Sequence, residues 1–219
     1  MADHLLTPRT RIDRHAERGS HDRAVIEAIL DEAFVCHVGF VHDGQPYVIP
    51  ANFGRAGEVL YLHGSAESRL MRTLAAGAPV CLTVTLLDGL VLARSAFNHS
   101  VNYRSVVVIG RATAIVEREE KVRALRVIVD HIVPGRWDEV RPPTDRELAD
   151  TTVVALRLAE ASAKIRAGPP VDQPRDRASP VWAGVLPLSL TPGAAVADAL
   201  TAPDAPVPGY LASYARRKE

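Results

Sequence analysis

The chain has 219 residues, of which 47% are hydrophobic, enough for one well-buried domain with an appendage. Its 26 basic and 26 acidic residues give a formal net charge of zero, so it lacks the broad basic surface of a protein that binds nucleic acid or membranes. Aromatic residues make up 5% of the chain, which argues against a stacking platform for single-stranded nucleic acid. We therefore expect neither nucleic acid nor a membrane as a partner.

The beginning of the chain, residues 1–20, is polar and basic without a repeating period, and we interpret it as an N-terminal arm that is partly ordered at best. It lacks the apolar segment of a secretory signal, and no apolar run approaches the ~20 residues needed to cross a bilayer. A cytoplasmic location is therefore expected. Cys36 and Cys81 each lie in an apolar run, so we expect buried free thiols and neither a disulfide nor a metal site.

The periodicity of the remaining chain predicts short strands joined by turns, with few helices between them. An Asp-Gly pair at 43–44 is a strong hairpin signal. Six or more closely spaced strands favour an antiparallel barrel, a mainly β fold with flanking helices (α+β). The predicted strands are 34–41, 45–52, 58–64, 78–87, 90–97, 104–116 and 151–166, and the predicted helices are 21–32, 66–76, 117–133 and a short one that Thr144 and Glu147 begin with a capping box. We expect a domain over 21–190 and a C-terminal tail over 191–219.

Nucleotide-binding and hydrolase motifs are missing from the sequence. There is no GxGxxG, no GxxxxGK[ST], no GxSxG and no HExxH pattern. If a nucleotide binds, another device must hold it. No Ser-His-Asp grouping stands out, so no catalytic residue is proposed.

The stretch HGSAESR, residues 63–69, ends a predicted strand and begins a predicted helix. With Ser65 as the N-cap, free backbone N–H groups gather around Gly64 and Ser65. Ser68 and Arg69 fall in the first turn of that helix, and His63 precedes it. Two interpretations stay open: a plain helix cap, or a site for an anion such as phosphate.

Two further stretches carry polar groups next to apolar strands. Residues 98–105, which include His99, open the apolar strand at 104–116 and form either a solvated loop or a polar wall facing a ligand. In YVIPANF, Pro50 belongs at a strand edge or a bulge, and Ala51 and Asn52 after it would leave backbone groups free. A simple strand end explains this second stretch equally well. His37, among apolar neighbours, is interpreted as a core histidine.

In order along residues 9–190, VIPANF, LYLHGSAESR, NYRSVVVIGRA, KIRAGPP and PVWAGVLPL resemble the pyridoxamine 5′-phosphate oxidase-related, FMN-binding split-barrel superfamily. The similarity is greatest to its flavin-nucleotide-binding branch, which includes nitroimidazole-resistance-type proteins. The resemblance implies a six-stranded antiparallel split β-barrel of Greek-key type. It also implies a homodimer with FMN in the clefts between two protomers.

The resemblance further implies where the cofactor lies. The strand over 47–53 would lay its backbone along the flavin ring, and the turn over 62–69 would hold the phosphate. Other contacts would come from the partner protomer and from a late tryptophan. The site residues expected on this basis are Pro50, Ala51, Asn52, His63, Gly64, Ser65, Ser68, Arg69, Arg104, Ser105 and Trp182.

The function that follows is an FMN-binding flavoprotein, acting as a flavin-dependent oxidoreductase on a small molecule. True pyridoxamine phosphate oxidases carry arginines and a lysine where this chain has VIPANF and WAGVLPL, so we do not expect vitamin B6 oxidation. The alternatives are a flavin carrier or sensor without turnover, and a haem-binding split barrel with His37, His63 or His99 as an axial ligand.

Overall fold

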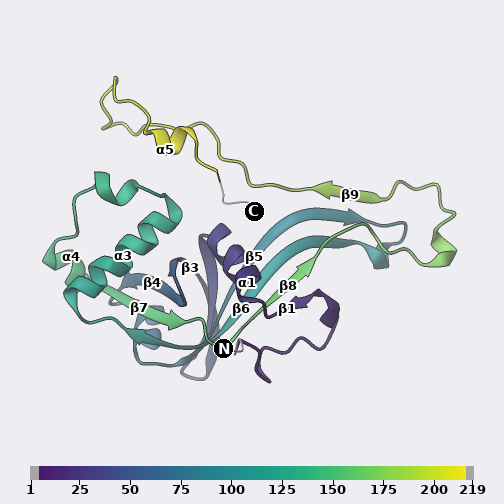
Figure 1. Cartoon of the computed structure of the whole chain (residues 1–219), viewed down its shortest axis with the longest axis horizontal. Coiled ribbons are helices and arrows are strands. Elements are labelled where there is room, and N and C mark those ends of the chain that lie inside the picture. Colours follow the sequence, from purple (N-terminus) through teal and green to yellow (C-terminus); the bar gives the residue numbers. More distant parts are fainter. Residues whose placement is uncertain (1–4, 216–219) are drawn as a thin grey trace.

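The computed structural model describes residues 5–215. Residues 1–4 of the predicted arm and residues 216–219 of the predicted tail lie outside this range. Strands dominate the fold, and the helices lie around them (Figure 1). The strands are β1 (Gly19–Ser20), β2 (Val35–His42), β3 (Gln45–Ala56), β4 (Val59–Ser65), β5 (Pro79–Leu92), β6 (Ser100–Ala114), β7 (Thr151–Arg157), β8 (Ala161–Arg166) and β9 (Gly184–Pro187). The helices are α1 (Arg23–Glu32), α2 (Arg69–Ala75), α3 (Arg118–Ile132), α4 (Asp145–Asp150) and α5 (Gly209–Ala212), with 3-10 turns η1 (Ala16–Arg18), η2 (Ala96–Asn98), η3 (Arg136–Glu139) and η4 (Pro174–Asp176).

The antiparallel strands close into a ring. Its order is β6-β7-β4-β3-β2-β5, and β5 returns to β6. Three short strands, β1, β8 and β9, pair outside this ring, so the described sheet has nine strands in all. The predicted class, a mainly β split barrel with flanking helices, is confirmed. The hairpin at 43–44 also forms as predicted, with positive φ angles of 50° at Asp43 and 74° at Gly44.

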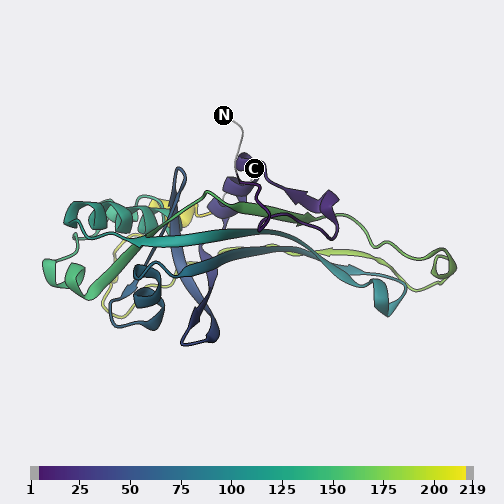
Figure 2. The same cartoon turned by 90° about the horizontal axis from the view of Figure 1, so that it is seen from below.

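Several strand boundaries differ from the prediction: β3 continues to Ala56, and β6 already begins at Ser100, so the polar residues 100–105 lie in a strand. Two other differences follow from sheet geometry. The chain does not turn at Asp88-Gly89, between the predicted strands 78–87 and 90–97. Instead β5 runs through it with a register shift, and pairs with β6 along its length to make the long ribbon that projects from the barrel (Figure 2). The expected single strand over 151–166 is divided at residues 158–160. Its first half, β7, lies between β4 and β6, and its second half, β8, lies between β6 and β1.

Apolar side chains from the ring strands and from α1 and α2 fill one core. Phe53, Leu60 and Leu62 are completely buried there. Helix α3 covers β3 from outside and approaches it closely at Gly54. Cys36 is buried as expected, and burial raises the pKa of its thiol to about 12. Cys81 is also free but exposed, which corrects the expectation that both thiols are buried, because its side chain points away from the core on β5.

The two ends of the described chain are held differently. The arm packs against β8: Leu5 is buried, Arg9 is paired with Glu160, and β1 adds to the edge of β8. After β9, residues 189–207 are exposed throughout, and the chain runs back across the molecule to α5 (Figure 1). There Tyr214 donates a hydrogen bond to the carbonyl of Ile132 at 2.7 Å. Among the described residues, no helix is long and apolar enough to span a membrane.

Candidate functional site

A pocket lies where β3 and β4 separate. Over 45–52, β3 pairs with β2 alone, and it joins β4 only over 53–56. The end of β4, residues 63–65, pairs with β7. The backbone edge of β3 that faces away from β2 is therefore without a partner strand along 45–52 in the described structure. The pocket, of about 370 Å³, is lined by Ile49, Pro50, Ala51, Asn52, His63, Gly64, Ser65, Ser68, Arg69, Leu70 and Met71.

This pocket unites the two stretches, VIPAN and HGSAESR, that the sequence analysis assigned to flavin ring and phosphate. It has the size of a small-molecule site and an uncharged wall along β3. The amide of Asn52 donates to the carbonyl of Phe34 at 3.3 Å. The structure adds Ile49, Leu70 and Met71 to the expected lining. Sequence reasoning did not find these three residues. Apolar residues in a strand or at the start of a helix are usual in any protein core, so they do not by themselves indicate a site.

The helix at this pocket begins later than predicted. Ser68, not Ser65, is the N-cap of α2, and its Oγ accepts from the backbone N–H of Met71 at 3.1 Å. Ser65 is still in β4, where it pairs with Thr151, and the N–H of Ala66 donates to the carbonyl of Asp150. These bonds to neighbouring segments keep 65–66 extended and delay the helix. The helix predicted over 66–76 therefore forms over Arg69–Ala75, and its predicted start and the Ser65 cap are wrong.

Arg69 is the cationic group of the pocket. Its guanidinium carbon lies 4.4 Å from the centroid of the Tyr47 ring, a cation–π contact that holds the side chain in place. In the part of the chain that the structure describes, Arg69 makes no ion pair or hydrogen bond. Its N–H groups are thus available to a ligand. Tyr47, which was not among the expected residues, is the positioning residue for it.

Of the three candidate haem-ligating histidines, one lines the pocket. His63 is on β4, and partial burial lowers the pKa of its imidazole below the usual value, so the ring is neutral at pH 7. His37 is exposed on β2, opposite Pro50 and Thr83, which corrects the expectation of a core histidine. His99 lies at the far end of the β5–β6 ribbon, where its Nδ1 contacts the carbonyl of Ser95 at 2.9 Å.

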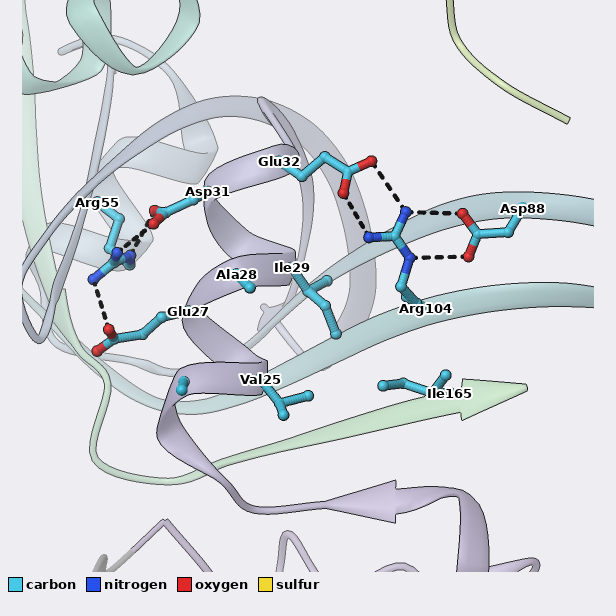
Figure 3. A pocket seen from close by; sticks show the side chains of 11 residues that line it. Val25, Glu27, Ala28, Ile29, Asp31, Glu32, Arg55, Asp88, Arg104 and Ile165 are labelled. Atoms are coloured by element: carbon cyan, nitrogen blue, oxygen red, sulfur yellow. Dashed lines mark hydrogen bonds and ion pairs between the residues drawn. The ribbon is translucent and has the colours of Figure 1, made fainter. Parts of the chain in front are cut away.

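The remaining expected residues lie away from this pocket within one chain. Arg104 is held between two carboxylates, at 2.5 Å from Glu32 and 2.8 Å from Asp88, and these hydrogen bonds, that to Asp88 first, raise the pKa of the guanidinium (Figure 3). Ser105 donates to the carbonyl of Lys164 at 3.3 Å. Trp182 is 66% exposed near β9. Contacts of these three with a cofactor across a dimer stay a prediction.

Arg104 borders a second, larger cavity of about 740 Å³ over α1. Its apolar floor includes Val25, Ile29 and Ile165, and a second arginine, Arg55, binds Asp31 at its other end (Figure 3). Sequence reasoning did not find this arrangement, because it joins α1 to strands that are distant in sequence. The guanidinium groups of Arg55 and Arg104 are both paired with carboxylates. Neither of these two arginines is therefore free to bind an anionic cofactor in this cavity.

Comparisons with known proteins agree with this geometry. The flavocytochrome Anf3 from Azotobacter vinelandii is 41% identical, with a TM-score of 0.88 over 94% of this chain and 96% of that one. A FAD and haem binding protein from Mycobacterium smegmatis is 38% identical, with a TM-score of 0.85 over 89% and 96%. A 5-nitroimidazole antibiotic resistance protein of Bacteroides thetaiotaomicron is 28% identical, with a TM-score of 0.58 over 67% and 86%.

The search of curated proteins found no match. A family model described as pyridoxamine 5′-phosphate oxidase matches residues 22–165, the segment that contains the ring strands β2 to β7. This match covers well over half of the chain, and the solved structures share its split-barrel topology. The chain therefore belongs to the pyridoxamine 5′-phosphate oxidase family.

Proposed function

We propose that the chain binds a flavin nucleotide in the pocket between β3 and β4 and acts as a flavin-dependent oxidoreductase on a small molecule. The observation that carries the proposal is the pocket itself. It unites an unpaired strand edge with a cation that has no acceptor of its own among the described residues. The similarity to a flavocytochrome and to a FAD-binding protein supports the same ligand class.

The two walls of the pocket fit the two parts of a flavin nucleotide. The free N–H and C=O groups of β3 suit the ring, whose heteroatoms both donate and accept hydrogen bonds. Arg69 suits a phosphate, which a guanidinium binds with charged hydrogen bonds. When bound, the flavin would supply hydride or electron transfer, and the protein would orient it and restrict access of water.

The proposal includes a homodimer in the cytoplasm, in which Arg104, Ser105 and Trp182 of a partner complete each site. FMN is the flavin that the sequence predicts, whereas the M. smegmatis relative is named for FAD. Vitamin B6 oxidation is not proposed, because VIPANF and WAGVLPL replace the cationic groups that would bind the substrate phosphate. A flavin carrier without turnover is the alternative within the same site.

Haem binding is a second candidate, favoured by the two relatives of 41% and 38% identity, both of which are described as haem proteins or cytochromes. His63 fits an axial ligand, because it lines the pocket, is neutral, and has no hydrogen-bond partner within residues 5–215. His37 is exposed on β2 and is therefore also accessible to a ligand.

The test is the identity of the bound group in the purified protein. Extraction and mass measurement distinguish FMN, FAD and haem, and a Soret band that is lost in His63→Ala but kept in His99→Ala would assign the axial ligand. Reduction of the bound flavin by NAD(P)H and reoxidation by an added acceptor would establish turnover. A protein that retains neither flavin nor haem after reconstitution contradicts the proposal.

A further inference from the structure

A buried arginine on β8 lacks the ion pair that other buried charges have. The described core contains three buried charged residues: Glu32, Arg166 and Asp172, each 8% exposed. Glu32 is paired with Arg104, and Asp172 with Arg94 at 2.7 Å. Arg166 forms no ion pair with any described residue. A covered charge without a counterion costs free energy, so this exception needs a physical explanation.

The hydrogen bonds of Arg166 use only one side of its guanidinium. Nη1 donates to the side-chain oxygen of Asn102 and, at 3.4 Å, to the carbonyl of Gly168. Asn102 also donates to Gly168 at 3.2 Å, which fixes this neutral cradle. For Nε and Nη2 the described residues supply no acceptor, and neither nitrogen is sealed from solvent.

The unused edge is the one that grips carboxylates elsewhere in this molecule. Arg55 binds Asp31 through Nε and Nη2 at 2.7 and 2.5 Å. Arg104 binds Asp88 through the same two nitrogens at 3.0 and 2.8 Å. This fork matches the two oxygens of a carboxylate or phosphate. In Arg166, Nη1 is bound to Asn102 and Gly168, and the edge formed by Nε and Nη2 has no acceptor among the described residues.

The surroundings of Arg166 favour a negative ligand. Burial and then the charge of nearby Arg18 lower the pKa of the Arg166 guanidinium, while the Tyr103 phenol opposes them weakly. Arg18 lies in η1 of the N-terminal arm, which is attached beside β8 through β1. The pairing of Gly19 with Lys164 places Arg18 beside the strand that ends at Arg166, near enough for its charge to act on that guanidinium. The partner of Arg18 is the exposed Glu17, at 3.5 Å.

We propose that the Nε/Nη2 edge of Arg166, together with Arg18, binds an oxyanion: the carboxylate or phosphate group of a small molecule. The site differs from the pocket between β3 and β4, and it needs no flavin. Its framework is Asn102 and Gly168, which orient Arg166, and the N-terminal arm, which supplies the second positive charge. The arm is thereby a binding element as well as a cover for the barrel edge.

The experiment measures thermal unfolding of the purified protein against inorganic phosphate, pyrophosphate and acetate, at constant ionic strength set with sodium chloride. The apparent affinity of the preferred anion is obtained from the rise in Tm. Arg166→Gln, which keeps a neutral donor, should weaken it about 10- to 150-fold, and Arg18→Gln about tenfold. The ranking of the three anions separates a phosphate ligand from a carboxylate ligand.

The controls separate a specific site from a general effect of charge. Arg146 is fully solvated in α4, and Arg146→Gln should leave the affinity unchanged within about twofold. Arg18→Gln also keeps the test decisive if Arg166→Gln folds poorly, because Arg18 belongs to a surface turn. Equal stabilisation of the wild type, Arg18→Gln and Arg146→Gln by every anion would overturn the proposal, and so would a lack of stabilisation of the wild type.

Discussion

Arg69 and Arg104 show how the same residue type serves different ends at different positions. Arg104 is neutralised by two carboxylates and joins elements of the fold. Arg69 rests on an aromatic ring and leaves its donors free. A cation–π contact restricts the side chain without neutralising it, so the charge remains available to a ligand. We therefore expect Arg69 to make the phosphate contact.

The first prediction concerns this contact. Arg69→Ala should weaken FMN binding by about 10- to 150-fold, because a charged hydrogen bond is worth about 1.5–3 kcal/mol. Riboflavin lacks the phosphate, so its affinity should hardly change. Flavin fluorescence titration of the apoprotein measures both values. Arg72→Ala, on the exposed side of the same helix, is the matched control, and equal losses for FMN and riboflavin would assign Arg69 a structural role.

His63 should make stability depend on pH. Its folded-state pKa is lowered below the unfolded value of about 6.5, so the unfolded state binds a proton first as the pH falls. The contribution is fully present above about pH 6.5 and is lost below it. The difference in free energy of unfolding between the wild type and His63→Gln should therefore shift against the wild type from pH 7.5 to pH 5.5. Urea unfolding at both values tests this, and a constant difference would contradict it.

At the scale of elements, α3 is fitted to β3 through a glycine. A Cβ at Gly54 would lie 2.7 Å from Ile128 Cα and 2.8 Å from the Val127 carbonyl oxygen, both in the helix backbone. Because backbone atoms cannot rotate away, Gly54→Ala should lower the free energy of unfolding by about 1–3 kcal/mol or more. Gly193→Ala, in open space in the tail, should have little effect. Chemical denaturation of the two variants provides the comparison.

The ion cluster of Arg104 joins α1 to the β5–β6 ribbon. Arg104→Met removes the guanidinium that binds the buried carboxylate of Glu32, which should cost about 3–5 kcal/mol. The double variant Arg104→Met/Glu32→Met removes both charges and should recover a large part of this loss. Equilibrium unfolding in denaturant measures both. If the double variant is less stable than Arg104→Met, the cluster does not act as a charge pair.

For the whole molecule, the outer face of the sheet predicts self-association. Along β2, β3 and β5 this face carries small or apolar groups such as Val35, Val48 and Leu87, which are 42%, 68% and 56% exposed. Apolar patches of this kind are typical of interfaces. We expect the strands at 80–86 and 104–110 to supply the contact of a homodimer, which should bury more than ~1,600 Å².

A single lysine should test this interface. Thr85 is exposed on β5 opposite Ser105, and Thr85→Lys would place a charge within the face. We expect a monomer by analytical ultracentrifugation at micromolar concentration, because a lysine cannot be desolvated there without a partner. Thr113→Lys, near the far end of β6, should remain dimeric. A wild-type monomer that still holds its flavin would show that the dimer is not required.

Local sequence signals determined much of this protein. Alternating apolar residues predicted the strands, Asp43-Gly44 its hairpin, and Thr144 with Glu147 the capping box of α4, because these structures depend on residues close in the chain. The order of motifs along 9–190 identified the split-barrel superfamily. The same motifs named residues that line one pocket, since VIPAN and HGSAESR each contribute a continuous stretch to it.

Only the tertiary structure decided the points that depend on distant partners. Ser68, not Ser65, caps the helix because Ser65 pairs with Thr151 in the sheet. Asp88 pairs with Arg104 because β5 continues through the turn that was expected between residues 87 and 90. Arg166 resembles any other strand arginine in the sequence. Its lack of a counterion emerges only when the packing around it is known, because hydrogen bonding and burial between segments far apart in the chain leave no local pattern.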